Sequence, residues 1–179
     1  MGWQVRHRHP CYFNLLSMAN IFHPTARVSQ LAVIDVSSRG TDTTIGAGSV
    51  VDDFVKIKHV GGTGNIEIGE HVYLNSFTVI YSGNGVRIGN DVLIGPNCSI
   101  VPANHNFSSR EMPIRLQKFA PSKGGVVIED DVWIGAGVVI LDGAYISRGS
   151  IIGAGSVVNK RTEPYSINIG NPLKCIGAR

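Results

Sequence analysis

His105 is the residue of this sequence whose type and surroundings best suit acid–base chemistry. It stands in a short run of small and polar residues that begins at Pro102. A neutral imidazole accepts a proton near neutral pH, so a histidine beside a bound alcohol can turn that weak nucleophile into a reactive one. His105 could instead be an ordinary surface histidine, since it is one of six in the chain.

The cysteines and the other histidines indicate neither a disulfide framework nor a metal centre. The three cysteines are Cys11, Cys98 and Cys175. They are too few and too scattered for a cluster, and they suit a reducing cytoplasm. His59, His71 and His105 lack the close spacing of a histidine pair that binds zinc, so we expect no metal.

The composition describes one domain with an aliphatic core. The chain has 179 residues, of which 43% are hydrophobic but only 7% aromatic. The net charge of +3 is too small to indicate nucleic-acid binding. No apolar run approaches the roughly 18 residues of a membrane span. We therefore expect a cytoplasmic protein that neither crosses a membrane nor binds nucleic acid.

An aliphatic residue recurs every six positions, and this repeat must build the scaffold that positions His105. The fifteen anchors are Ile45, Val51, Ile57, Ile68, Leu74, Ile80, Ile88, Ile94, Ile100, Ile128, Ile134, Ile140, Ile146, Ile152 and Val158. Side chains alternate along a strand, so each anchor and the residue two before it face the same side, which must be the interior. Three short strands and their corners then close a triangular coil of about 18 residues, and stacked coils form a parallel β-helix.

Small residues accompany the anchors in a regular way. Glycine directly follows the anchor in six of the fifteen repeats, which indicates turns or a close approach of neighbouring backbone. Four residues after most anchors stands a small or β-branched residue, and Cys98 holds one of these inward positions. We therefore expect Cys98 to be buried rather than to act as a nucleophile.

The interruptions of the repeat predict where the chain leaves the coils. Ile100 and Ile128 are 28 residues apart, four more than a multiple of six, so residues 103–125 are predicted to protrude as a loop. Residues 1–24 lack the repeat and are predicted to form an N-terminal arm or short helix that caps the first coil. The β-helical domain would then span residues 25–179.

From residue 66 to residue 177 the sequence resembles the sugar O-acetyltransferases of the hexapeptide-repeat family. These include galactoside and maltose acetyltransferases and enzymes that act on bacterial surface polysaccharides. The matching stretches are IGEHVYLN (68–75), IGNDVLIGPN (88–97), DDVWIGAG (130–137), IGAGSVV (152–158), PYS (164–166) and GNP (170–172). The resemblance implies a left-handed β-helix, a homotrimer and acetyl-CoA as the acetyl donor.

The resemblance also implies which residues contact the acceptor. In that family the histidine that opens the protruding loop is the general base, and His105 matches it. An asparagine 30 residues earlier helps to place the acceptor, and Asn75 matches it. Within one chain these two residues would lie on different corners of the triangle. They would meet only where a corner of one chain faced another corner of its neighbour, as in a cyclic trimer.

For the donor, the resemblance places coenzyme A along the C-terminal coils. Backbone at Ala136 and Ala154 would line the pantetheine arm. Trp133 would shape the wall of the cleft, or it could simply be packed at the surface. Lys160 matches a family position that meets the phosphates of coenzyme A, or it could belong to a solvated basic C-terminal segment.

The predicted function is that of an acetyl-CoA-dependent O-acetyltransferase that acts on a sugar or a surface-polysaccharide precursor by direct transfer. One alternative is an N-acetyltransferase of an amino sugar or an antibiotic-modifying acetyltransferase. Another is a non-catalytic β-helix, which would need neither a protruding loop with a histidine nor a C-terminus of the type that binds coenzyme A.

Overall fold

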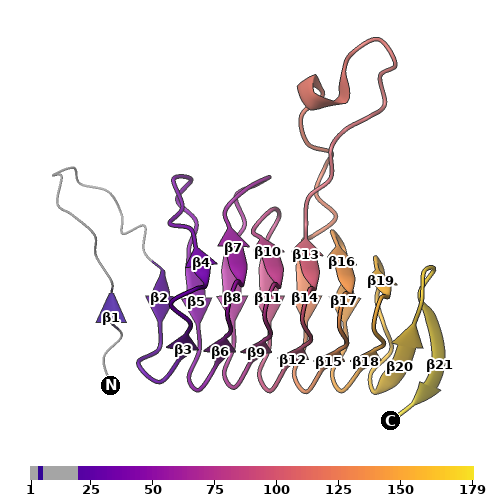
Figure 1. Ribbon diagram of the computed structural model, residues 1–179. Coiled ribbons are helices and arrows are strands. Elements are labelled where there is room, and N and C mark those ends of the chain that lie inside the picture. The colour runs from indigo at the N-terminus through magenta and orange to yellow at the C-terminus, as the bar shows by residue number, and fades with distance from the viewer. Residues whose placement is uncertain (1–3, 6–19) are drawn as a thin grey trace, which may run out of the picture.

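The described part of the chain is a left-handed parallel β-helix from which a long loop projects (Figure 1). The computed structural model describes residues 4–5 and 20–179. The arm or short helix predicted for residues 1–24 therefore lies largely outside the described residues. Residues 21–22 already belong to the first coil, because they pair in parallel with residues 44–45 of the next one.

Within the described residues the strands form three sheets, one for each face of the triangle. The first sheet contains, in order, β1 (Gln4–Val5), β2 (Ile21–Phe22), β5 (Thr43–Ile45), β8 (Ile66–Ile68), β11 (Val86–Ile88), β14 (Val126–Ile128) and β17 (Tyr145–Ile146). The second contains β4 (Val33–Ile34), β7 (Lys56–Lys58), β10 (Val79–Tyr81), β13 (Ser99–Val101), β16 (Val139–Leu141) and β19 (Val157–Val158). The third contains β3 (Arg27–Val28), β6 (Val50–Val51), β9 (Tyr73–Leu74), β12 (Leu93–Ile94), β15 (Trp133–Ile134), β18 (Ile151–Ile152), β20 (Ser166–Ile169) and β21 (Lys174–Ala178). Each coil passes from the first sheet to the third and then to the second.

The loop and the C-terminal end depart from the parallel coil. Residues 102–125 leave the helix between β13 and β14, which confirms the predicted loop, and they contain the 3-10 turn η1 (Ile114–Leu116). Strands β20 and β21 form an antiparallel hairpin that the repeat does not predict, because its last anchor is Val158. No helix among residues 4–5 and 20–179 is long and apolar enough to span a membrane.

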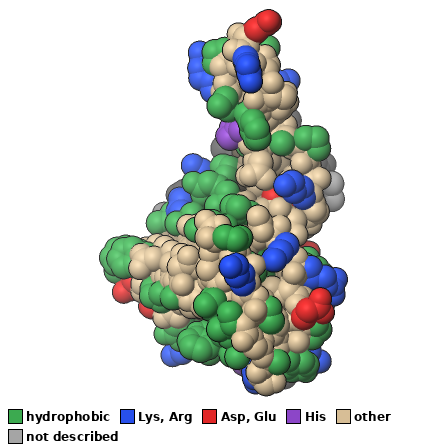
Figure 2. Space-filling model, turned by 90° about the vertical axis from the view of Figure 1, so that its right-hand side faces the viewer, with side chains coloured by type: hydrophobic (Ala, Val, Ile, Leu, Met, Phe, Trp, Pro, Cys, Tyr) green, Lys and Arg blue, Asp and Glu red, His purple; other side chains and the backbone are tan. Residues whose placement is uncertain are grey.

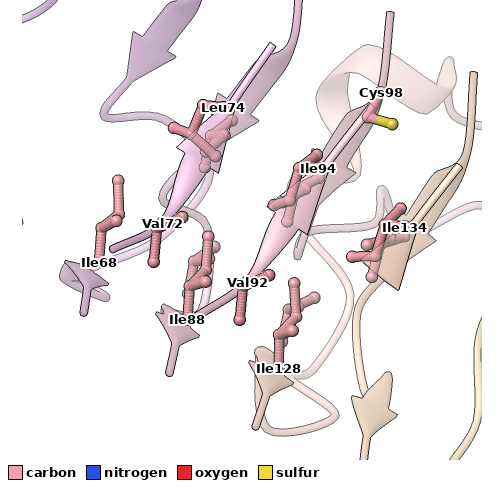
Figure 3. Packing of buried hydrophobic residues seen from close by; sticks show 14 of the residues in the cluster. Ile68, Val72, Leu74, Ile88, Val92, Ile94, Cys98, Ile128 and Ile134 are labelled. Atoms are coloured by element: carbon pink, nitrogen blue, oxygen red, sulfur yellow. The ribbon is translucent and has the colours of Figure 1, made fainter. Parts of the chain in front are cut away.

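The interior is a column of aliphatic side chains stacked coil upon coil (Figure 3). All fifteen anchors predicted from the repeat are buried, with no more than 3% of each side chain exposed. Cys98 is buried as predicted, and so are the other small or β-branched residues four positions after an anchor, whereas Asn84 and Asn104, which hold the same position, are only partly buried. Anchors also pair with anchors in register, as Ile94 does with Leu74 and Ile134, so every coil repeats the same inward packing.

Two backbone positions in the corners explain why small residues recur there. The residue after the anchor touches the next coil: a Cβ on Gly135 would lie only 2.6 Å from the backbone nitrogen of Ala154. The residue three after the anchor has left-handed backbone in most corners, as Asn97 (φ 59°) and Gly137 (φ 67°) do. The sequence revealed the first position but not the second, where several residues are not glycine.

Ile94 and Leu93 of β12 allow the core to be tested, because one side chain points inward and the other outward. Ile94 is fully buried, whereas Leu93 is 53% exposed. Truncating Ile94 to alanine should lower the free energy of unfolding by about 2–5 kcal/mol, through lost burial and the cavity left behind. Leu93→Ala should lower it by less than about 1 kcal/mol. Chemical denaturation measures both values, and equal losses would contradict the inward packing of Ile94.

Candidate active site

The residues selected from the sequence lie on two edges of the β-helix and on the face beside one of them. We call the corners that follow strands of the third sheet the Asn75 edge, and those that follow strands of the second sheet the His105 edge. The Asn75 edge carries Asn75, Ala136 and Ala154, shortly after β9, β15 and β18. The His105 edge carries His105 and Lys160, beyond β13 and β19.

The Asn75 edge is smooth at its C-terminal end because its corner residues are small. Ala136 and Ala154 are exposed, as is the glycine after each, and a Cβ on either glycine would meet no atom within 4 Å. The two alanines lie one coil apart, about 4.8 Å, so open backbone forms a strip along the helix axis. Further along this edge the Asn75 side-chain nitrogen donates to the carbonyl oxygen of Ile94 at 2.7 Å, whereas its amide oxygen has no hydrogen-bond partner among the described residues.

His105 is exposed at the root of the loop and is oriented by Phe119 on the returning segment. The two residues form an antiparallel bridge, flanked by backbone hydrogen bonds of 3.0 and 2.8 Å. Their rings stack with centroids 4.9 Å apart and planes 27° from parallel. Phe119 in turn lies over Gly61, where a Cβ would come within 3.4 Å of the ring. No group in the described part of the chain hydrogen-bonds to the imidazole, so both ring nitrogens are open to a ligand.

A buried carboxylate, Asp142, anchors the returning end of the loop. It is 2% exposed, and its two oxygens accept from the backbone nitrogens of Lys123 (2.8 Å) and Gly125 (2.9 Å). Asp142 also accepts from the side-chain nitrogen of Asn84 at 3.1 Å. The backbone nitrogen of Asn84 donates to the carbonyl oxygen of Pro102 at 2.9 Å, where the loop leaves the coil. Asn84 and Asp142 therefore hold both ends of the loop from the adjacent coils.

The body of the loop is held together by Gln117 and presents apolar and basic side chains. The Gln117 amide accepts from the nitrogen of Ser109 at 2.9 Å and donates to the carbonyl oxygens of Ser109 and Met112 at 2.9 and 2.7 Å. Figure 2 shows apolar and basic side chains on the projection. The exposed large apolar residues are Phe107, Met112, Ile114, Leu116 and Phe119. The basic residues of the loop are Arg110, Arg115, Lys118 and Lys123.

Trp133 lies on the outer face of the third sheet, next to the Asn75 edge. It is 55% exposed and stands between Leu93 and Ile151 in the ladder of parallel strands. These residues line a shallow hollow together with Asp131 and Arg179, whose side chains form an ion pair at 3.0 Å. The indole is therefore an accessible flat surface in a hollow on the outer face of the third sheet.

In one chain the fold places Asn75, Ala136 and Ala154 along one edge but does not bring His105 to it. His105 and Asn75 lie on different corners of the triangle, as the topology inferred from the repeat requires. Phe119 and Asp142, which orient and anchor the loop, were not selected from the sequence. Nothing in their spacing from His105 distinguishes them from the other aromatic and acidic residues.

The thiol of Cys98 is not placed to act as a nucleophile. Cys98 is fully buried, with its sulfur 3.2 Å from the carbonyl oxygen of Gly135, and burial raises the pKa of the thiol above its usual range. Over residues 4–5 and 20–179, no three histidine, cysteine or acidic residues are grouped closely enough to hold a metal ion.

Comparison with known proteins matches both the repeat and a longer stretch of the chain. Residues 125–160 match the family described as bacterial transferase hexapeptide (six repeats), and residues 85–103 match the hexapeptide repeat of succinyl-transferase. The dTDP-4-amino-4,6-dideoxy-D-glucose acyltransferase of Escherichia coli is 30% identical over 139 residues, covering 76% of this chain and 71% of that protein. The galactoside O-acetyltransferase of Lactococcus lactis is 35% identical over 62% of this chain and 52% of its own length. The chain spans about half the length of the first curated relatives that it matches.

Solved structures share the fold. A hexapeptide-repeat acetyltransferase from Vibrio cholerae, crystallised with acetyl coenzyme A, is 30% identical with a TM-score of 0.59, over 75% of this chain and 69% of that one. An N-acyltransferase from Bacillus cereus, crystallised as a mutant with dTDP and coenzyme A, has a TM-score of 0.72 over 88% of this chain and 83% of that one. Its identity of 22% supports a likeness of fold alone.

Asp142 can be tested as the anchor of the loop. Asp142→Ala removes the acceptor of three hydrogen bonds and leaves buried donors unpaired, so it should lower the free energy of unfolding by about 1–3 kcal/mol. It should also speed proteolytic cleavage within residues 103–125. Glu111→Ala, which removes an exposed carboxylate from the loop itself, is the matched control and should change neither property. Equal cleavage rates in the two variants would contradict the anchoring role.

Proposed function

We propose that this chain, which belongs to the hexapeptide-repeat acyltransferase family, transfers an acetyl group from acetyl-CoA to a hydroxyl of a sugar or surface-polysaccharide precursor. The observation that carries the proposal is the open imidazole of His105, held at the root of a clamped loop. The named activities of the relatives and the acetyl coenzyme A in the Vibrio cholerae structure support the reaction class. The free thiols of Cys98 and Cys175 suit a cytoplasmic site of action.

In the proposed reaction His105 is the general base. The acceptor hydroxyl donates a hydrogen bond to the imidazole, and its oxygen attacks the acetyl carbonyl carbon as the imidazole takes the proton. A backbone N–H stabilises the negative charge on the carbonyl oxygen. The carbon–sulfur bond then breaks, and the imidazolium returns the proton to the leaving thiolate. Asn75 orients the acceptor through its amide oxygen.

The C-terminal part of the Asn75 edge is the proposed track for the pantetheine arm. Ala136 and Ala154 lie on the open backbone strip, where an extended chain can approach closely and hydrogen-bond to peptide groups. Trp133 is exposed on the third sheet three residues before Ala136, and its indole is the proposed apolar wall.

Lys160 is the proposed contact for the phosphates of coenzyme A. Its ammonium makes no ion pair with any described residue, so its charge is available. Two arginines of the C-terminal segment are already engaged: the guanidinium of Arg161 lies 4.0 Å above the ring of Tyr145, and Arg179 pairs with Asp131. Of these basic groups, Lys160 is the one that an incoming phosphate can reach without breaking an existing contact.

A complete site requires the Asn75 edge of one chain to face the His105 edge of another, which supports a homotrimer. On the His105 edge, β13 and β19 lie two strand spacings apart, about 10 Å. On the Asn75 edge the selected residues follow β9, β15 and β18, so they extend over three strand spacings, about 14 Å. Both sets end in the coil formed by β17, β18 and β19, so the two edges present their selected residues over overlapping lengths of the helix. Cyclic three-fold symmetry would give three equal clefts.

A second candidate function is transfer to an amine. The Escherichia coli relative, which this chain covers over 71% of its length, is named for an amino-sugar substrate. The same base could remove the proton that an attacking amine must lose. Amino sugars therefore belong beside neutral sugars in the panel of acceptors.

The general base is tested by measuring thiol release from acetyl-CoA with a panel of free sugars, nucleotide sugars, amino sugars and polysaccharide fragments. His105→Ala should reduce acceptor-dependent release by about 10²- to 10⁴-fold, because no positioned base then removes the proton of the acceptor hydroxyl. His71→Ala is the matched control: His71 is also exposed, lies on another corner, and should be dispensable. Undiminished release by His105→Ala would refute the mechanism, and the acceptor that works would distinguish oxygen from nitrogen transfer.

The shared cleft is tested by mixing two inactive variants. Asn75→Ala and His105→Ala chains, unfolded and refolded together in equal amounts, should regain about a quarter of the sites of the native trimer, because random assembly pairs intact edges at that frequency. Each variant refolded alone should stay inactive. If both residues acted within one chain, the mixture would recover no activity above that of the separate variants.

A further inference from the structure

The N-terminal half of the Asn75 edge bears two exposed aromatic side chains, Phe54 and Phe77, with Leu31 in the corner before them. We call these three side chains the aromatic ridge. They occupy three successive corners, between β3 and β4, β6 and β7, and β9 and β10. Each is about half exposed, at 52%, 50% and 54%. The ridge ends beside the proposed acceptor contact, since Phe77 follows Asn75 by two residues in the same corner.

The two phenylalanines occupy a corner position whose left-handed backbone the fold requires but whose side chain it leaves free to vary. Phe54 and Phe77 have φ values of 59° and 63°, in the left-handed region that bulky side chains resist. The next two corners of this edge meet the same requirement with Asn97 and Gly137, which adopt it more easily. Phenylalanine is therefore a costly choice at this position, and a cost of this kind suggests that the exposed rings have a role at the surface.

The two rings stack on each other, and the stack ends at Phe77, where the ring of a ligand could extend it. Their centroids are 5.0 Å apart and their planes 17° from parallel, so the rings follow the spacing of the coils. The next corner places Asn97 where a third ring would stand, and the one after it has Gly137. The stack of rings therefore ends at Phe77, and the next corner carries the smaller side chain of Asn97.

Carboxylates and hydroxyls border the ridge. Asp52 accepts a hydrogen bond from the hydroxyl of Ser76 at 2.8 Å, and Asp53 accepts one from Ser29. Hydrogen bonds from the backbone of Asp53 and the side chain of Ser76 hold the pKa of Asp52 below its usual value. Neither carboxylate has a basic group within ion-pair distance among the described residues, so this border is negatively charged at neutral pH.

We propose that the aromatic ridge is a stacking platform for a second sugar ring of the acceptor, the ring next to the one that is acetylated. The inference rests on the proposed function, because it takes Asn75 as the contact of the reacting sugar. An aromatic face is electron-rich and attracts the C–H groups of a pyranose, while carboxylates accept hydrogen bonds from its hydroxyls. Asp52 and Asp53 repel phosphate, so the ligand is an uncharged oligosaccharide rather than a nucleotide.

The platform is tested by ligand binding to the full chain, measured by saturation-transfer NMR without acetyl-CoA. The probes are lactose with two rings, methyl β-galactoside with one, and uridine diphosphate. Lactose should bind more tightly than methyl β-galactoside, and uridine diphosphate should not bind at the ridge. Equal affinity for the one-ring and two-ring probes, or no binding of lactose, would overturn the proposal.

Variants at Phe77 separate stacking from a merely structural role. Phe77→Asn should weaken lactose binding by about 3- to 10-fold through loss of the aromatic face. It should also raise the unfolding temperature, because asparagine tolerates the left-handed backbone. Phe77→Tyr should keep lactose binding and Phe77→Leu should lose it. Ile176→Ala, which removes an exposed apolar side chain at the other end of the helix, is the control and should bind lactose normally.

Two further outcomes distinguish this proposal from the proposed function and from a subunit contact. Loss of the native oligomer in Phe77→Asn, measured by analytical ultracentrifugation, would show that the ridge contacts another copy and would overturn the platform. Phe77-dependent lactose binding without acetyl transfer to any acceptor would sustain the platform and refute the transferase. Acetyl transfer at the native rate by Phe77→Asn, with one-ring and two-ring acceptors alike, would sustain the transferase and refute the platform.

Discussion

Hydrogen bonding between coils stacked at one strand spacing is the constraint on which the rest of this structure depends. Each coil must repeat the coil before it closely enough for strands to pair in register, so inward side chains must be similar in size at every turn. The aliphatic anchors meet this demand, and glycines such as Gly135 let successive corners touch through their backbones. A residue that disturbs one coil therefore disturbs its neighbours on both sides.

This constraint leaves the edges of the helix free to differ from coil to coil. The corner position three residues after the anchor has the same backbone in coil after coil, yet it holds Phe77, Asn97 and Gly137 in succession along the Asn75 edge. One edge thus changes from an apolar ridge to a smooth backbone strip without any change in the core. Such a rigid rod can present different surfaces to an acceptor and to an extended donor along a single line.

The loop is the one long departure from the rod in the described residues, and its stability comes from the coils that flank it. Asn84 and Asp142 belong to neighbouring coils and clamp both ends of the loop, while Phe119 orients the ring of His105 across its root. The rigid coils thereby restrict the position of the exposed imidazole. Because Asn75 lies on a different edge, the proposed site is completed by an edge of another chain.

The sequence by itself determined the inward residues, the extent of the loop and the burial of Cys98. These follow from a six-residue period, which is visible in the sizes and polarities of residues close together in the chain. Resemblance added the family and the handedness of the helix. Only the tertiary structure decided that Asp142 clamps the loop, that Phe119 stacks on His105 and that a hairpin closes the C-terminal end. Asn84 and Asp142 are 58 residues apart, and they meet because the coils stack in register around an inserted loop. No local period encodes such a contact.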